Sequence, residues 1–354
     1  MPFDINPEIS KASTLPKEFY LDPQYFKNCL DNIFPESWQI AADKNNLKKN
    51  NIYPINFLSS LLDEPLVLIN HNNEINCFSN VCTHRAHLVA DKPCNGSKLR
   101  CMYHGRTFNL DGRYSYMPGF EETENFPTEK DNLQSIPIKN WKNLIFVSLK
   151  GGIDIMPALN DAEKRLASYP FDDLIHSKNS SQSWEIDAHW ALYCENYLEG
   201  FHVPYVHRGL AKEIDVNTYK TILLENAVLQ IAEGDKSYDI FKNIDKTDQN
   251  LYGLYYWIFP NLMLNFYSWG LSINIIEPIS PSKTRIRFLS YPIKNNEQPI
   301  DGDDTLSKVE KEDQNVVLGV QKGIKSRFYS SGRYSPKHEK GIHHFHLLLD
   351  KYLT

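Results

Sequence analysis

Two loops in the first half of the chain each pair one cysteine with one histidine, residue types that bind metals. One residue separates Cys82 from His84, two separate Cys101 from His104, and sixteen lie between the loops. Structural zinc sites more often take two cysteines from one loop and two histidines from another. One of each per loop suits a two-iron cluster, in which cysteines hold one iron and histidines the other. Such a cluster relays single electrons, and its neutral imidazoles raise its potential.

A second group of such side chains lies in the second half of the chain. Asn196, Glu199 and His202 recur every third residue and share one face if the segment is helical. His207 follows His202 by five residues, which regular helix would place about 140° away. Pro204 disfavours regular helix at the residue before it. A distorted turn at this proline would bring both imidazoles to one point.

Two histidines need a carboxylate to complete the ligand set of a non-haem iron(II) oxygen site. Residues 305–326 have helical periodicity, and Asp313 falls on their apolar stripe. A carboxylate on a core face is costly unless it is paired or metal-bound, so Asp313 is the candidate third ligand. A capping or salt-bridged aspartate at the edge of the stripe is the alternative. Glu310, Lys311 and Glu312 lie off the stripe and are predicted to face solvent.

The elements that must position these residues differ between the two halves. Residues 52–150 are predicted to form short strands with a hairpin turn at 71–74, and 44–51 are predicted as a polar loop. The two glycines after residue 150 mark a domain boundary. The second half predicts strands followed by helices, which indicates an α+β domain. The predicted strands are 183–191, 222–231, 262–276 and 284–291, and the predicted helices are 305–326 and 339–353.

Composition excludes several classes of protein. A chain of 354 residues predicts about two domains, and its 41% hydrophobic content excludes global disorder. The net charge of −6 argues against nucleic-acid binding. No apolar run approaches the about 18 residues of a membrane helix, and the N-terminus lacks the features of a secretory signal. We therefore expect a cytoplasmic protein whose six cysteines are reduced thiols or metal ligands.

Together these segments resemble a known family. The cysteine–histidine loops, with Gly105 and the turn at 108–112, resemble the Rieske iron–sulfur domain. From about residue 36 to its C-terminus the chain resembles the α subunit of Rieske non-haem iron oxygenases, also called ring-hydroxylating oxygenases. Glu199 stands where that family has an aspartate, as in some members that oxidise quaternary amines. The family pattern, Asn-x-x-Asp-x-x-His-x4-His with a late aspartate, reads here as Asn196, Glu199, His202, His207 and Asp313.

The resemblance implies an α+β fold with three parts. Residues 1–35 would form an N-terminal arm that packs on the catalytic domain, and 36–150 an all-β Rieske [2Fe–2S] domain. Residues 151–354 would form the mononuclear iron domain, with an antiparallel sheet and covering helices of the helix-grip type.

It also implies ligands and partners. The expected ligands are Cys82, His84, Cys101 and His104 for the cluster, and His202, His207 and Asp313 for the iron(II). Asn196 and Glu199 are the catalytic candidates beside the iron. Electrons come from a separate NAD(P)H-dependent reductase, and O2 reacts with a small substrate. Because the two sites lie in different domains, a head-to-tail homotrimer is implied, in which Glu199 bridges to a cluster histidine of the partner subunit.

The segments 196–207 and 332–346 resemble choline monooxygenase-like members, which hydroxylate or demethylate trimethylammonium compounds. We therefore expect an oxygenase for a quaternary ammonium compound such as choline, betaine or carnitine. Ring faces attract such cations, and the candidates for an aromatic cage are Tyr252, Tyr255, Tyr256, Trp257, Phe259, Phe266, Tyr267 and Trp269. The alternatives are an aromatic-ring-hydroxylating mono- or dioxygenase, a Rieske electron-transfer protein without catalysis, and a zinc-stabilised binding protein. The histidines of 343–346 are predicted as a surface and packing cluster.

Overall fold

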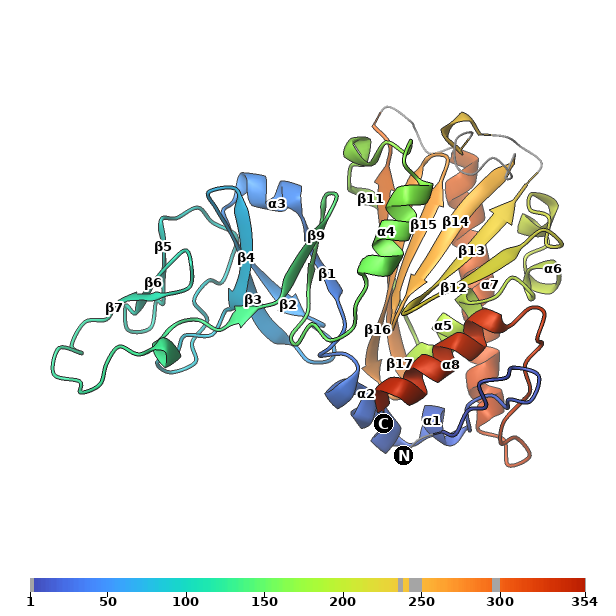
Figure 1. The fold of residues 1–354 in the computed structure, drawn as a ribbon, viewed down its shortest axis with the longest axis horizontal. Coiled ribbons are helices and arrows are strands. Elements are labelled where there is room, and N and C mark those ends of the chain that lie inside the picture. Colours follow the sequence, from blue (N-terminus) through green and yellow to red (C-terminus); the bar gives the residue numbers. More distant parts are fainter. Residues whose placement is uncertain (1–2, 235–237, 242–249, 295–299, 354) are drawn as a thin grey trace. The chain divides into compact units, whose positions relative to one another are not determined.

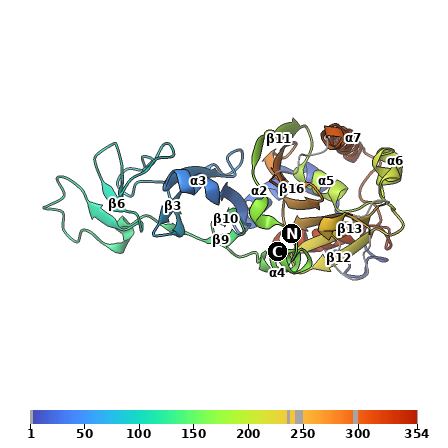
Figure 2. The ribbon, with the colours of Figure 1, turned by 90° about the horizontal axis from the view of Figure 1, so that it is seen from above.

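The chain divides into two compact units, Pro35–Gly152 and Met1–Phe34 with Ile153–Thr354. The first consists of three small antiparallel sheets, and the second holds a seven-stranded antiparallel sheet with helices (Figures 1 and 2). The predicted α+β class is therefore confirmed. The computed structural model describes residues 3–234, 238–241, 250–294 and 300–353.

The strands of the unit Pro35–Gly152 follow the orders β1-β10-β9, β2-β3-β4-β8 and β5-β6-β7. The predicted hairpin joins β3 to β4, and both loop residues, Asn72 and Asn73, take positive φ, as a two-residue hairpin loop requires. The bounds are β1 Gln39–Asp43, β2 Ile52–Phe57, β3 Glu64–His71, β4 Glu74–Ser79, β5 Lys98–Arg100, β6 Thr107–Asn109, β7 Tyr114–Tyr116, β8 Ser135–Ile136, β9 Ile138–Trp141 and β10 Leu144–Val147, with the helix α3 Lys44–Lys49 and the 3-10 turn η1 Glu129–Asp131.

The prediction of a polar loop at 44–51 is wrong, because α3 forms there. The Asp43 carboxylate accepts from the Asn45 N–H at 2.7 Å, and the Asn46 side chain accepts from the Asp43 N–H at 3.1 Å. This capping box satisfies donors at the start of the helix. Leu47 is buried, so a single apolar side chain anchors an otherwise polar helix.

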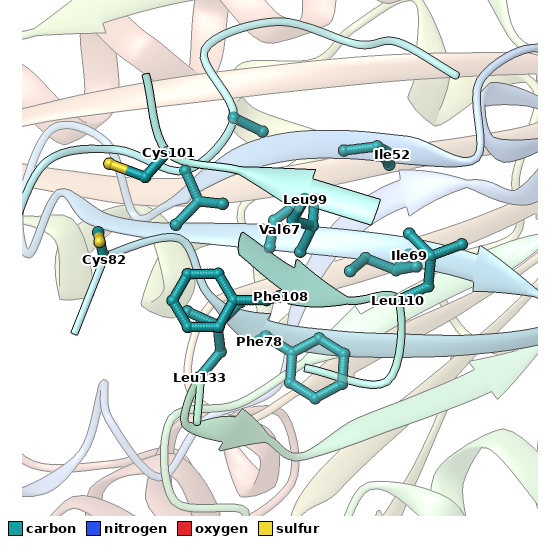
Figure 3. Close-up of a cluster of buried hydrophobic side chains, with 12 residues drawn as sticks. Ile52, Val67, Ile69, Phe78, Cys82, Leu99, Cys101, Phe108, Leu110 and Leu133 are labelled. Carbon is teal, nitrogen blue, oxygen red and sulfur yellow. The ribbon is translucent and has the colours of Figure 1, made fainter. Parts of the chain in front are cut away.

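The apolar core of this unit lies beneath the two cysteine–histidine loops. Figure 3 shows Cys82 and Cys101 at one end of a cluster that includes Phe108 and Phe78. Gly112 takes a positive φ of 82°, and a Cβ there would lie 2.6 Å from the Phe78 ring. Only glycine fits that turn, which therefore holds β6 and β7 against the core.

The second unit is organised around a single antiparallel sheet of order β11-β17-β16-β15-β14-β13-β12 (Figure 1). Two predicted strands are each a hairpin: 222–231 splits into β12 and β13, and 262–276 into β15 and β16. The strand predicted at 183–191 ends at Ile186, and a helix begins at Trp190. The bounds are β11 Ser177–Ile186, β12 Lys220–Leu224, β13 Ala227–Glu233, β14 Leu251–Ile258, β15 Leu262–Tyr267, β16 Gly270–Ser280 and β17 Lys283–Pro292.

Helices cover both faces of this sheet. In β14, Tyr256 donates to Asp161 of α4 at 2.8 Å, while its neighbour Tyr255 pairs with Asn265, which accepts from Tyr197 of α5 at 2.6 Å. Adjacent strand residues point to opposite faces, so α4 and α5 lie on opposite sides. The helices are α1 Glu18–Leu21, α2 Pro23–Asn32, α4 Met156–Arg165, α5 Trp190–Tyr197, α6 Val203–Val206, α7 Ile300–Ile324 and α8 Lys340–Leu353, with 3-10 turns η2 Phe171–Asp173, η3 Leu210–Lys212 and η4 Asp239–Phe241.

The N-terminal arm is tied to the C-terminal segment of the same unit. Arg333 donates to the carbonyls of Ala12 and Ser10, and His343 bonds to the Asn6 carbonyl at 2.9 Å. His343 and His346 are buried, so the predicted packing role holds but the predicted surface position is wrong. Among the described helices, none has the length and apolar character needed to cross a membrane.

Candidate metal centres

The second unit brings His202, His207 and Asp313 together, with one potential ligand atom from each lying within 4.8 Å of the others. The Nε2 atoms of the two histidines are 3.2 Å apart. Asp313 Oδ1 lies 2.9 Å from His207 Nε2 and 3.5 Å from His202 Nε2. Two imidazoles and one carboxylate that converge on one point form the ligand set of non-haem iron(II) oxygen sites.

Local sequence explains how two histidines five residues apart converge. The helix α6 has only four residues, with His202 immediately before it and His207 immediately after it. Pro204 lies in its first turn, where a missing N–H costs no hydrogen bond. The predicted distortion is therefore a short isolated helical turn, and Asp313 reaches the pair from the middle of α7.

Each of the three side chains is held by a neighbour. His202 Nδ1 donates to Glu199 at 2.6 Å, and the same carboxylate accepts from the backbone N–H groups of Phe201 and His202. His207 Nδ1 donates to Glu312 at 2.9 Å, and Asn196 donates to Asp313 at 2.6 Å. Carboxylates on the outer nitrogen fix the ring orientation and make the inner nitrogen a better ligand.

Two of the solvent-facing predictions for α7 are wrong. Glu312 contacts His207, and Glu310 accepts a hydrogen bond from the buried Tyr193, whereas Lys311 is exposed as predicted. Asn196, Glu199 and His202 do not lie on one helix, because α5 ends at Tyr197 and Glu199 lies between α5 and α6. The contacts of Asn196 and Glu199 with the site are made nonetheless. The inward positions of α7 are Glu310, Asp313, Val317, Gln321 and Ile324.

These surroundings shift the pKa values of Glu310 and His207. Burial, and then the negative charge of Asp313, raise the pKa of Glu310 to about 8. Burial alone would lower the pKa of His207, but its contacts with Asp313 and Glu312 outweigh that effect and raise it. The site is thus rich in negative charge, which a metal cation would offset.

The two cysteine–histidine loops of the first unit are built alike. In the first loop, the Cys82 N–H donates to the His87 carbonyl and the Ala86 N–H donates to the Cys82 carbonyl. In the second loop, the Cys101 N–H donates to the Arg106 carbonyl and the Gly105 N–H donates to the Cys101 carbonyl. Ala86 and Gly105 both take positive φ. Both thiols are buried, and the rings of His84 and His104 lie 4.8 Å apart, partly exposed. Two buried thiols and two outward imidazoles fit a [2Fe–2S] cluster with cysteines on one iron and histidines on the other.

The fold and both sites define a class: an oxygenase component with an electron-relay cluster and a mononuclear iron. Comparisons agree, since residues 37–127 match the Rieske [2Fe-2S] domain and 171–354 match the family described as "Ring hydroxylating alpha subunit (catalytic domain)". The chain belongs to this family of Rieske oxygenases. It is therefore an oxidoreductase with a [2Fe–2S] cluster and a mononuclear iron, in a family that uses O2, a small substrate and a separate reductase. The zinc-protein and electron-carrier alternatives are thereby set aside.

The chain is similar to known relatives over most of their length. Choline monooxygenase of Arabidopsis thaliana is 30% identical, with 98% of this chain and 84% of that protein covered. The carnitine monooxygenase oxygenase subunit of Escherichia coli strain K12 is 28% identical, and the match covers 98% of this chain and 95% of that protein. One solved structure matches this chain with a TM-score of 0.79 and 25% identity, over 100% of this chain and 99% of that chain. It is described as a quaternary ammonium Rieske monooxygenase that gives insight into carnitine oxidation by gut microbiota and inter-subunit electron transfer.

The predicted aromatic cage divides into two groups. Four candidates lie apart from the metal site: Tyr256 bonds to α4, Phe266 contacts its ring, and Trp257 and Phe259 pack around Phe345 of α8. The other four gather in one place, with the Tyr267 ring 5.6 Å from Tyr255, 6.4 Å from Tyr252 and stacked on Trp269 at 5.3 Å.

One further tyrosine at this place escaped the sequence analysis. A Cβ on Gly200 would lie 3.1 Å from the Tyr219 ring, so glycine lets that ring approach the loop before His202. Tyr219, Tyr252 and Tyr255 pack against a small apolar cluster that includes Val203, the residue after His202. No local motif marks Tyr219, and only the hairpin that follows it along the chain brings it to the site.

Proposed function

We propose that this chain is the oxygenase component for a small quaternary ammonium compound of the choline, betaine or carnitine kind, which it hydroxylates or demethylates. At the proposed sites a bound ferrous ion supplies oxygen activation, and a bound [2Fe–2S] cluster supplies single electrons. His202, His207 and Asp313 hold the ion, and Cys82, His84, Cys101 and His104 hold the cluster.

The observation that carries this proposal is the combination of tyrosines and carboxylates around the triad. Three tyrosines pack against the apolar cluster that includes Val203 of α6. Glu199 and Glu312 contact the two histidines, and Glu310 contacts the buried Tyr193 nearby. Among the described residues, no lysine or arginine forms an ion pair with these carboxylates. Glu199, Glu312 and Asp313 together carry three negative charges, one more than a ferrous ion balances, even with Glu310 protonated. A substrate cation that rests on ring faces fits this balance.

Oxygen uptake with product mass spectrometry tests the proposal. The iron-loaded protein, NADH and a surrogate reductase would be assayed with choline, glycine betaine, carnitine and a panel of aromatic acids. The matched control is 3,3-dimethyl-1-butanol, which has the shape of choline without its charge. Cation–π binding of about 1–2 kcal/mol predicts a loss of about 5- to 30-fold in kcat/KM for the uncharged compound. Coupled turnover only on aromatic rings, or equal use of both isosteres, would refute the proposal.

We also propose that the chain works as a homotrimer in which Glu199 bridges its own His202 to a cluster histidine of the partner subunit. Each unit has exposed apolar side chains beside its metal site. Met102, next to the cluster loop, is 80% exposed, and Tyr205, next to the triad, is 76% exposed. Large exposed apolar residues gathered at a functional site are typical of an interface. A cytoplasmic location is proposed as well, supported by six cysteines that are all free.

A further inference from the structure

Arg106 is buried in an unusual way for an arginine. Only 2% of it is exposed, and within the described part of the chain its one ionic partner is Asp131, at 2.6 Å. Its guanidinium lies 5.2–5.8 Å from the ring centroids of Phe108, Tyr114 and Phe126. Its Nε has no hydrogen-bond partner among the described residues. Arginine is almost never fully buried unless it is paired, so this charge is held inside at a cost.

The position of Arg106 ties it to the cysteine end of the cluster site. Its carbonyl accepts from the Cys101 N–H at 2.8 Å, which closes the second ligand loop. Phe108, against which the guanidinium packs, belongs to the same buried core as Cys82 and Cys101 (Figure 3). The Asp131 carbonyl accepts from the Arg106 guanidinium at 3.3 Å and from the Thr83 hydroxyl, in the first ligand loop, at 2.8 Å. The ion pair therefore contacts both ligand loops.

We propose that the Arg106 cation, held by Asp131, raises the reduction potential of the [2Fe–2S] cluster. Reduction adds one negative charge to a cluster in apolar surroundings. A fixed positive charge nearby stabilises the reduced form more than the oxidised form, and apolar walls weaken its screening. Arg106 is thus a positioning and tuning residue, and the inference holds whatever the substrate is.

The two halves of the ion pair give opposite predictions. Arg106→Gln removes the cation and lowers the cluster potential, whereas Asp131→Asn removes the counter-charge and raises it. A tenfold change in the reduction equilibrium corresponds to 59 mV for one electron, and we expect at least about that shift for Arg106→Gln. Asparagine keeps an oxygen that can accept from the Thr128 N–H, as Asp131 does at 2.8 Å.

The measurement is an anaerobic redox titration of the cluster-loaded protein, followed by EPR or visible circular dichroism. Arg113→Gln is the matched control, since it removes the same charge from the same unit at a side chain that is 78% exposed. We expect no resolved shift for it, because water screens exposed charges. Arg106→Lys keeps the charge and should retain most of the wild-type potential.

A role of the pair in folding alone makes a different prediction. Loss of either partner would then lower stability while the potential stayed unchanged or moved in the same direction for both variants. Either result would overturn the proposal. If Arg106→Gln does not incorporate a cluster, Asp131→Asn decides alone: a raised potential supports the tuning role, and an unchanged or lowered one refutes it.

Discussion

Replacing Glu312 tests whether α7 orients a ligand as well as supplying one. Its carboxylate accepts from His207 Nδ1 at 2.9 Å, and its side chain is 31% exposed. Loss of such a partner typically weakens metal binding by about 10- to 100-fold. Each factor of ten is about 1.4 kcal/mol. Because partial exposure screens the contact, we expect Glu312→Ala to weaken iron binding by about tenfold, and Glu312→Gln, which keeps an acceptor, by less.

The assay is competition for ferrous iron against a calibrated chelator under anaerobic conditions, with the cluster spectrum as an internal measure of folded protein. Lys311→Ala is the matched control, because Lys311 is the neighbouring residue on the same helix and faces solvent. Iron affinity that is unchanged in Glu312→Ala, or lowered equally in Lys311→Ala, would refute the orienting role.

Two further predictions concern other carboxylates of the site. Glu199→Ala should leave a cluster that the reductase still reduces but almost no product, and normal turnover would rule out the proposed bridge. Glu310 has a raised pKa of about 8, so its protonated form favours the folded state. Metal-free wild type should therefore lose stability as pH rises from about 4.5 to 8, relative to Glu310→Gln, in paired thermal-unfolding scans at pH 5 and 8. Parallel pH dependence of the two proteins would contradict the burial of this carboxyl.

The ligand loops could be predicted because their information is local. The spacing of cysteine and histidine is visible in the sequence, and so is Pro204 between the two histidines of the triad. Asp313 could be predicted from the sequence for a different reason, since helical periodicity places it on an inward face. These features led to the family, and the structure adds how each side chain is held.

The residues that sequence analysis missed are those whose environment is set by tertiary packing. The sequence predicts that Glu310 and Glu312 face solvent, because the apolar residues of α7 indicate a different buried face. Val320 is in fact 44% exposed, and the inward face carries polar groups instead. Arg106 shows the same problem, since no local pattern indicates that an arginine is enclosed by aromatic rings.

Element boundaries failed where turn signals are weak. The turn between β12 and β13 falls at residues 225–226, Glu-Asn, without a glycine or proline, so two strands were predicted as one. The lysines and asparagines of α3 indicate a polar loop, although a capping box at Asp43 begins a helix there. Cap hydrogen bonds of this kind become apparent only in three dimensions.

The most direct test of the account is how iron divides between the two sites. The wild-type protein, loaded anaerobically, should hold about three irons per chain, two in the cluster and one at the triad. Asp313→Ala should hold about two and keep the cluster EPR signal of wild type, and Cys101→Ser should lose that signal and retain the mononuclear iron. If Asp313→Ala kept all its iron, the assignment of the triad would be contradicted. If the wild-type protein took up zinc and stayed colourless, the assignment of both centres would be contradicted.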